Sequence, residues 1–147
     1  MNNQNFKIIA LGVFFLATVG MMYHVTSTNT ELRNINVQIE ETNDGTWRVR
    51  DINGTNKGRM NVNRKDKIAW QAKGSEMIFT FSENVDKYFD YEEGLFEDGK
   101  SQRIDRSKKL RVTLKDGAPQ DTLVYEVYVT EADTFVVGNS PPVLIIQ

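Results

Sequence analysis

The chain contains no cysteine, and its 147 residues include a single histidine, His24. The missing thiols exclude disulfides, thiolate metal sites and lipid attachment at an N-terminal cysteine. A nucleophilic triad needs a histidine base, and residues 35–147 contain no histidine. A trigonal copper centre needs two imidazoles and a thiolate, which the chain cannot supply. The remaining nucleophilic pair, Ser107 and Lys108, are neighbours whose side chains would point to opposite faces of a strand. The sequence therefore predicts a protein that is not an enzyme and holds no metal or cofactor.

Neither sign of charge is in marked excess, because the chain has 18 Lys and Arg residues and 20 Asp and Glu residues. Without a basic field, the chain is not expected to bind nucleic acid. A charged share of 26% and a hydrophobic share of 39% are typical of a globular protein rather than a disordered one. About 115 residues follow the N-terminal segment, which is enough for one domain with its own core.

One long uncharged stretch lies near the N-terminus, at residues 8–23, with the sequence IIALGVFFLATVGMMY. Lys7 precedes it and the next basic residue is Arg33, so the positive-inside tendency keeps the N-terminus in the cytoplasm and translocates the rest. We therefore expect a cytoplasmic N-terminus at residues 1–6, one transmembrane helix at residues 7–26, a linker at residues 27–34 and an extracytoplasmic domain at residues 35–147. The expected location is the cell membrane, with the domain in the periplasm or outside the cell.

A cleaved signal peptide is the alternative interpretation of the same segment. The sixteen residues 8–23 would span about 24 Å as a helix, short of the roughly 30 Å hydrocarbon core unless flanking residues join them. Signal cleavage needs small residues at positions −3 and −1, and the pairs Thr18/Gly20 and Val25/Ser27 fit this rule only loosely. Retention as an anchor is therefore favoured, and cleavage would instead release a secreted domain.

After the linker, apolar residues recur at every second position, the spacing of strands with one buried face. Eight groups show this pattern or a short apolar run: Ile35, Val37 and Ile39; Trp47 and Val49; Met60 and Val62; Ile68 and Trp70; Met77, Phe79 and Phe81; Leu110, Val112 and Leu114; Leu123, Tyr125, Val127 and Val129; and residues 143–146. Turn residues separate them, for example at residues 43–45, 53–54 and 116–117. Residues 84–89 are expected to form a helical turn. The pattern predicts an all-β antiparallel sandwich or barrel.

Two stretches resemble the cupredoxin family, the Greek-key β-sandwich of plastocyanin, azurin and the soluble part of cytochrome oxidase subunit II. Residues 62–70, VNRKDKIAW, are similar to the family's Gly-Asp-x-Val-x-Trp pattern at the start of a strand, with Lys65 where glycine is usual. Residues 122–129, TLVYEVYV, resemble the penultimate strand, and residues 140–146, SPPVLII, resemble the closing strand. The resemblance implies a Greek-key antiparallel β-sandwich over residues 35–147.

The copper ligands of that family have no counterpart in this chain. The resemblance would place the first histidine near Glu76 or Met77, the cysteine near Val129 and the second histidine within residues 130–139. None of these positions is a histidine or a cysteine. The resemblance therefore implies a cupredoxin-like domain without metal.

Residues 87–99, KYFDYEEGLFEDG, mix aromatic rings with carboxylates. Tyr88, Phe89, Tyr91 and Phe96 form a candidate surface for a protein partner, since aromatic residues are enriched in docking sites, although about half of these rings are expected to pack inward. Six carboxylates in or next to this stretch are interpreted as a solvated acidic loop, and calcium binding is the alternative because carboxylate oxygens suit that ion. They are Asp86, Asp90, Glu92, Glu93, Glu97 and Asp98.

A basic run follows this stretch, formed by Arg103, Arg106, Lys108, Lys109 and Arg111. We interpret it as the solvated face and edge of a hairpin, where charge discourages pairing with other chains. Contact with anionic lipid head groups is the alternative.

Taken together, these patterns predict a membrane-anchored extracytoplasmic domain without metal that acts as a binding or assembly module. Two other functions stay open. The chain could be an accessory subunit of a membrane respiratory complex, related to an oxidase subunit that has lost its copper site. It could also be a soluble β-sandwich that binds a ligand such as a carbohydrate.

Overall fold

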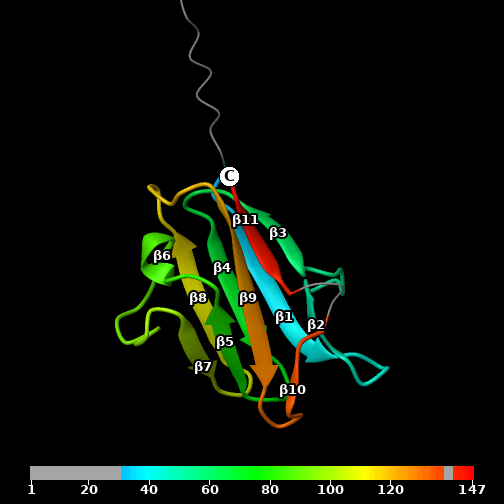
Figure 1. The fold of residues 1–147 in the computed structure, drawn as a ribbon. Helices are drawn as coiled ribbons and strands as arrows, with labels where there is room; N and C mark the ends of the chain where they lie inside the picture. Colours follow the sequence, from blue (N-terminus) through cyan, green and yellow to red (C-terminus); the bar gives the residue numbers. More distant parts are fainter. Residues whose placement is uncertain (1–30, 138–140) are drawn as a thin grey trace, which may run out of the picture.

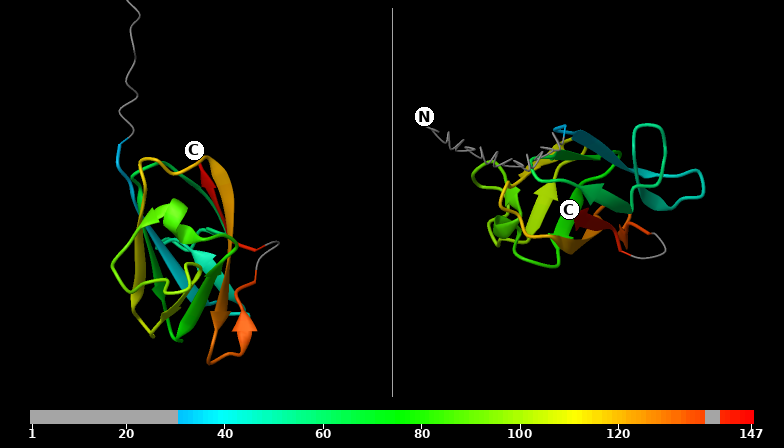
Figure 2. Two further views of the ribbon diagram at one scale, coloured as in Figure 1. Left: turned by 60° about the vertical axis from the view of Figure 1, so that its left-hand side comes forward. Right: turned by 90° about the horizontal axis from the view of Figure 1, so that it is seen from above.

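The computed structural model describes residues 31–137 and 141–147, which fold as a sandwich of two β-sheets (Figure 1). The first sheet has the strand order β2-β1-β4-β8-β6, and the second has the order β3-β11-β9-β5-β7 with β10 paired to β9. Figure 2 shows the two sheets facing each other from the side and from one end. The strands are β1 (Asn34–Glu41), β2 (Trp47–Arg50), β3 (Arg59–Val62), β4 (Lys67–Ala72), β5 (Met77–Phe81), β6 (Phe89–Asp90), β7 (Ser101–Ile104), β8 (Lys109–Leu114), β9 (Asp121–Val129), β10 (Thr134–Phe135) and β11 (Val143–Ile146). Thus the prediction of an all-β sandwich is confirmed.

Each of the eight predicted groups of apolar residues falls on a strand, and their inward side chains fill the space between the sheets. Strand β9 illustrates the pattern, because Leu123, Tyr125, Val127 and Val129 are all buried. Trp70 on β4 is fully buried, and its ring centroid lies 5.7 Å from that of Tyr125 on the facing sheet. The core therefore follows directly from the period-two pattern of the sequence.

The sheets are mixed, so the antiparallel prediction is wrong for two pairings. Strand β1 runs parallel to β4, and β11 runs parallel to β3, whereas the other pairs are antiparallel. Parallel neighbours cannot be joined by a tight hairpin and need a longer connection. Here β2 and β3 come between β1 and β4 in the chain, and β3 lies in the opposite sheet. Apolar periodicity is the same in both kinds of pairing, so the sequence pattern did not reveal this.

Three short strands were not predicted, namely β6, β7 and β10. Strands β6 and β10 have two residues each, and β7 has four, of which only Ile104 is buried. None is long enough or apolar enough to show an alternation. The expected helical turn within residues 84–89 is confirmed as the 3-10 helix η1 (Val85–Lys87), which begins after the capping side chain of Asn84.

Both described ends of the chain lie at the same end of the sandwich (Figures 1 and 2). The Arg33 side chain, just before β1, donates hydrogen bonds to Asp66 and to the Asn61 carbonyl at the end of β3. The backbone N–H of Gln147 donates to the Val62 carbonyl at 3.0 Å. A segment that precedes residue 31 and the C-terminus therefore reach the domain on the same side.

The predicted cytoplasmic N-terminus, transmembrane helix and most of the linker, residues 1–30, lie outside the described residues. Within residues 31–137 and 141–147, no helix has the length and apolar character needed to cross a membrane.

Candidate functional site

The aromatic rings proposed from the sequence as a partner surface are placed mostly inside the domain. Tyr88 and Phe89 are fully buried, and Phe96 is 3% exposed. Phe89 and Phe96 each meet the ring of Phe81 at 5.8 and 5.6 Å between centroids, and together they close the open end of the core. Of the four rings, only Tyr91 keeps part of its surface in solvent. The structure thus leaves one of these side chains available to a partner.

Tyr88 is buried with its polar end satisfied. Its hydroxyl donates a 2.6 Å hydrogen bond to Asp121 at the start of β9. Burial, reinforced by this bond, raises the pKa of Tyr88, and the same bond lowers the pKa of Asp121. The pair therefore ties the end of η1 to the start of β9 in the second sheet.

Three of the six carboxylates of the predicted acidic loop, Asp86, Asp90 and Asp98, have separate partners. The Asp98 carboxylate accepts hydrogen bonds from the backbone N–H groups of Ser101 and Lys100, and these bonds lower the pKa of Asp98. The Asp86 carboxylate accepts a hydrogen bond from the Tyr91 hydroxyl. Across the described residues, no group of three or more histidine, cysteine, aspartate or glutamate side chains could hold a metal ion.

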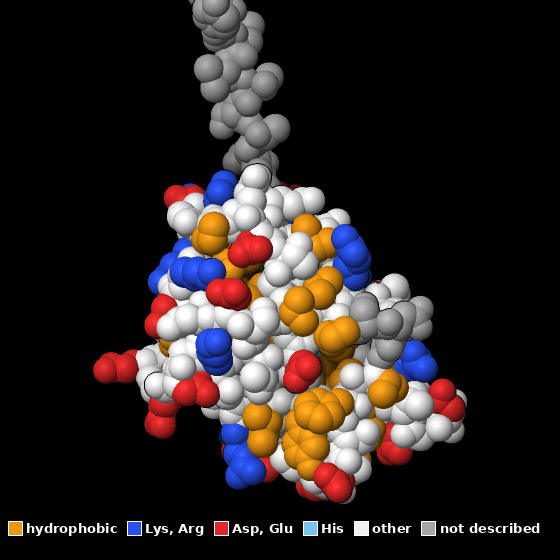
Figure 3. All heavy atoms as spheres, in the orientation of Figure 1, with side chains coloured by type: hydrophobic (Ala, Val, Ile, Leu, Met, Phe, Trp, Pro, Cys, Tyr) orange, Lys and Arg blue, Asp and Glu red, His pale blue; other side chains and the backbone are white. Residues whose placement is uncertain are grey.

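A surface that the sequence analysis missed lies on the outer side of the second sheet, where β10 pairs with β9. We call it the distal apolar surface, and it consists of Tyr128, Phe135, Val137 and Pro141, with the buried Pro142 lining the cavity behind them. Phe135 and Val137 are 53% and 45% exposed, and the rings of Tyr128 and Phe135 lie 5.2 Å apart. Figure 3 shows apolar side chains gathered from the middle of this face towards the end away from the C-terminus.

The backbone around β10 explains why these side chains face solvent. The N–H of Val136 donates to the Val127 carbonyl, and the N–H of Val137 donates to the Trp47 carbonyl. The chain is therefore held in an extended conformation in which Val136 packs inward, and Phe135 and Val137 point outward. A cavity of about 230 Å³ lies among these residues and the two prolines. The run Thr134–Val137 is too short to show an alternating pattern, so periodicity could not have found it.

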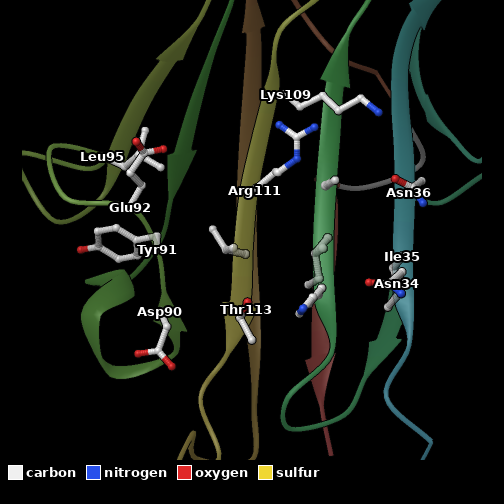
Figure 4. Close-up of a pocket in the computed structure, with 14 residues that line it drawn as sticks. Asn34, Ile35, Asn36, Asp90, Tyr91, Glu92, Leu95, Lys109, Arg111 and Thr113 are labelled. Carbon is white, nitrogen blue, oxygen red and sulfur yellow. The ribbon is translucent and has the colours of Figure 1, made fainter.

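A second concave surface lies on the outer side of the first sheet (Figure 4). It is a hollow of about 640 Å³ that we call the sheet hollow. Asn36, Ala69 and Arg111 are direct neighbours across β1, β4 and β8, and their side chains form its floor. Tyr91 and Leu95, from the segment after β6, line one side. Ala69 is the small side chain in the middle of this row, which leaves the floor low.

The charges of the sheet hollow are divided between floor and side. Lys67, Lys109 and Arg111 come from the strands, whereas Asp90 and Glu92 come from β6 and the segment after it. Within the described part of the chain, none of the three cations forms an ion pair or a side-chain hydrogen bond. Asp90 Oδ1 lies 3.9 Å from Lys115 Nζ, and this ammonium partly balances the negative charge of Asp90. The floor therefore carries unbalanced positive charge.

The Tyr91 hydroxyl beside the hollow is already engaged. It donates to Asp86, and this bond raises the pKa of Tyr91 to about 12. The hydroxyl therefore stays protonated near neutral pH, and its bond to η1 fixes the ring at the side of the hollow.

No protein-family model matches this chain, and a search of curated proteins gives no significant match.

Proposed function

We propose that this chain is a binding or assembly module of cupredoxin-like fold without metal, anchored in the membrane through residues 7–26 and docking a protein partner through the distal apolar surface. The observation that carries the docking surface is the exposure of Phe135 and Val137 beside the ring of Tyr128. Large apolar side chains clustered in solvent mark interaction sites, because water is displaced from them when a partner covers them.

The position of this surface suits an anchored module. The segment before residue 31 reaches the sandwich at the end where Arg33 and Gln147 lie, and β10 lies at the opposite end (Figure 1). If residues 7–26 lie in the membrane, the distal apolar surface points away from it. A partner can then approach the surface without being blocked by lipid.

The cupredoxin-like fold is supported by two features. The stretch likened to the penultimate strand forms β9, and it pairs antiparallel with β11, the stretch likened to the closing strand. Lys65, which occupies the position where the family has glycine, has a φ of 70°. That backbone conformation is the left-handed one that glycine adopts without steric cost.

Site-specific photo-crosslinking in native membranes tests the docking surface. A photo-reactive residue at Val137 should give one discrete adduct, and the adduct should be lost when Phe135→Asp is added. The same probe at Ile52, which is 75% exposed in the loop between β2 and β3, is the control and should give none. Equal labelling from both positions would contradict the proposal. An adduct with a haem- or copper-bearing subunit would make the chain an accessory subunit of a respiratory complex.

A further inference from the structure

We propose that the sheet hollow is a binding site for a carboxylated saccharide, with Arg111 and Lys109 holding the carboxylate. This site lies on the opposite sheet from the distal apolar surface, so it does not depend on the docking function.

The first argument is the uncompensated charge of the floor. Figure 4 shows the Lys109 side chain crossing over β4, and the Arg111 side chain extending from β8 towards β4. Neither has a carboxylate partner among the described residues. Two cations held on one rigid strand repel each other, and a bound anion between them would remove that repulsion. The planar guanidinium also offers two parallel N–H groups, which match the two oxygens of a carboxylate.

The second argument separates a sugar acid from other anions. Asn34, Asn36 and Thr113 line the same hollow, and each can both donate and accept hydrogen bonds. Asp90 and Glu92 add acceptors at its side. A saccharide presents many hydroxyl groups that need both kinds of partner. A phosphate chain or a peptide rich in aspartate and glutamate has few hydroxyl groups and would leave most of these hydrogen-bonding groups without a partner.

The third argument is the shape of the hollow. Its volume of about 640 Å³ is within the range of small-molecule sites. The floor is made of strand residues whose backbone positions are fixed by pairing between β1, β4 and β8, so the charged side chains start from fixed neighbouring positions before a ligand arrives. Tyr91 and Leu95 give the hollow an apolar side against which the carbon face of a sugar ring can pack.

Binding of trigalacturonate to the full-length chain in non-ionic detergent tests the site. Calorimetric titration at moderate salt should give saturable binding to one site, and the neutral trisaccharide maltotriose should bind at least about tenfold more weakly. Arg111→Gln should weaken trigalacturonate binding by at least about tenfold, the loss expected for a hydrogen bond between charged groups. Arg59→Gln, which removes the same charge from an exposed position on β3 of the other sheet, should leave binding unchanged.

Several results would overturn the proposal. Equal losses in Arg111→Gln and Arg59→Gln would mean attraction by overall charge alone. Tighter binding of tripolyphosphate or of a tri-glutamate peptide would assign the hollow to a different ligand, and absence of saturable binding would remove the site. Both variants change exposed side chains, and an unchanged thermal midpoint will show that they fold. If Arg111→Gln does not fold, Lys109→Gln replaces it with the same expected loss.

Discussion

The indole nitrogen of Trp70 donates a 3.2 Å hydrogen bond to the hydroxyl of Tyr125, across the centre of the sandwich. Trp70 belongs to the first sheet and Tyr125 to the second, and both are fully buried. Burial raises the pKa of Tyr125, so its hydroxyl stays protonated throughout the ordinary pH range. The bond therefore links the two sheets directly within the core.

Removing the Tyr125 hydroxyl should destabilise the domain. Tyr125→Phe leaves the Trp70 N–H buried without an acceptor, and we expect the free energy of unfolding to fall by about 1–3 kcal/mol. Urea unfolding followed by tryptophan fluorescence measures the change. Tyr128→Phe is the matched control, because its hydroxyl bonds to Asp133 at the surface, and it should cost less than about 0.5 kcal/mol. Equal losses of unfolding free energy in the two variants would mean that the buried hydrogen bond stabilises the domain no more than the surface one.

Asp66 should make the stability of the domain depend on pH. Burial alone would raise its pKa, but hydrogen bonds from the Arg33 side chain and from the backbone N–H groups of Asn63 and Arg33 outweigh burial and hold the pKa below 3.8. The folded-state pKa is therefore below the unfolded one. Its contribution to stability is fully present above the unfolded pKa, and is lost as pH falls through the folded pKa.

Urea unfolding at a series of pH values from 7 to 2 tests this. Asp66→Asn should lower the free energy of unfolding at pH 7 by about 1.5–3 kcal/mol, the value of hydrogen bonds to a charged group. The gap between wild type and variant should then shrink as pH falls below about 4, near the unfolded pKa of aspartate. A gap that stays constant down to pH 2 would contradict the role assigned to Asp66.

Lys65 has a left-handed backbone conformation that suits glycine. Its φ of 70° costs a residue with a Cβ atom about 1 kcal/mol. We expect Lys65→Gly to be more stable than Lys65→Ala by about 0.5–1 kcal/mol, after allowing for the greater freedom of glycine in the unfolded chain. Both variants lose the exposed ion pair with Asp116, so the loss of this ion pair cancels when thermal unfolding of the two is compared. If Lys65→Gly were less stable than Lys65→Ala, the backbone at this position would not be strained.

The sequence predicted the parts of the fold that depend on local periodicity, and missed those that depend on pairing. Leu123 to Val129 alternate over a whole strand, so β9 was evident. The sequences of β1 and β4 do not reveal that the two strands run parallel, because the same residues face inward in a parallel or an antiparallel pair. The sheet hollow was missed for a related reason. Asn36, Ala69 and Arg111 are distant in the chain and become neighbours only through strand pairing.

Burial of the aromatic stretch after η1 leads to opposite expectations for two neighbouring rings. Phe96→Ala removes a buried ring that contacts Phe81, and it should lower the free energy of unfolding by about 3 kcal/mol or more. Tyr91→Ala removes a half-buried ring, which should cost about 1 kcal/mol. Chemical denaturation of both variants compares them directly. If Phe96→Ala were the milder change, the ring would belong to the surface, as the sequence alone had proposed.

The apolar segment at residues 8–23 should hold the full-length chain in the membrane. Leu, Ile, Phe and Val each favour insertion by about 0.3–0.6 kcal/mol at the centre of a helix, and no charge in the segment opposes them. We expect unprocessed protein in the membrane fraction after carbonate washing, with a C-terminal tag open to protease added outside the cell. Leu16→Arg should cost about 3 kcal/mol of insertion and shift protein out of this fraction, whereas Leu16→Ile should not. A shortened protein released outside the cell would contradict the predicted anchor but agree with the predicted export. Full-length protein in the cytosol would contradict both predictions.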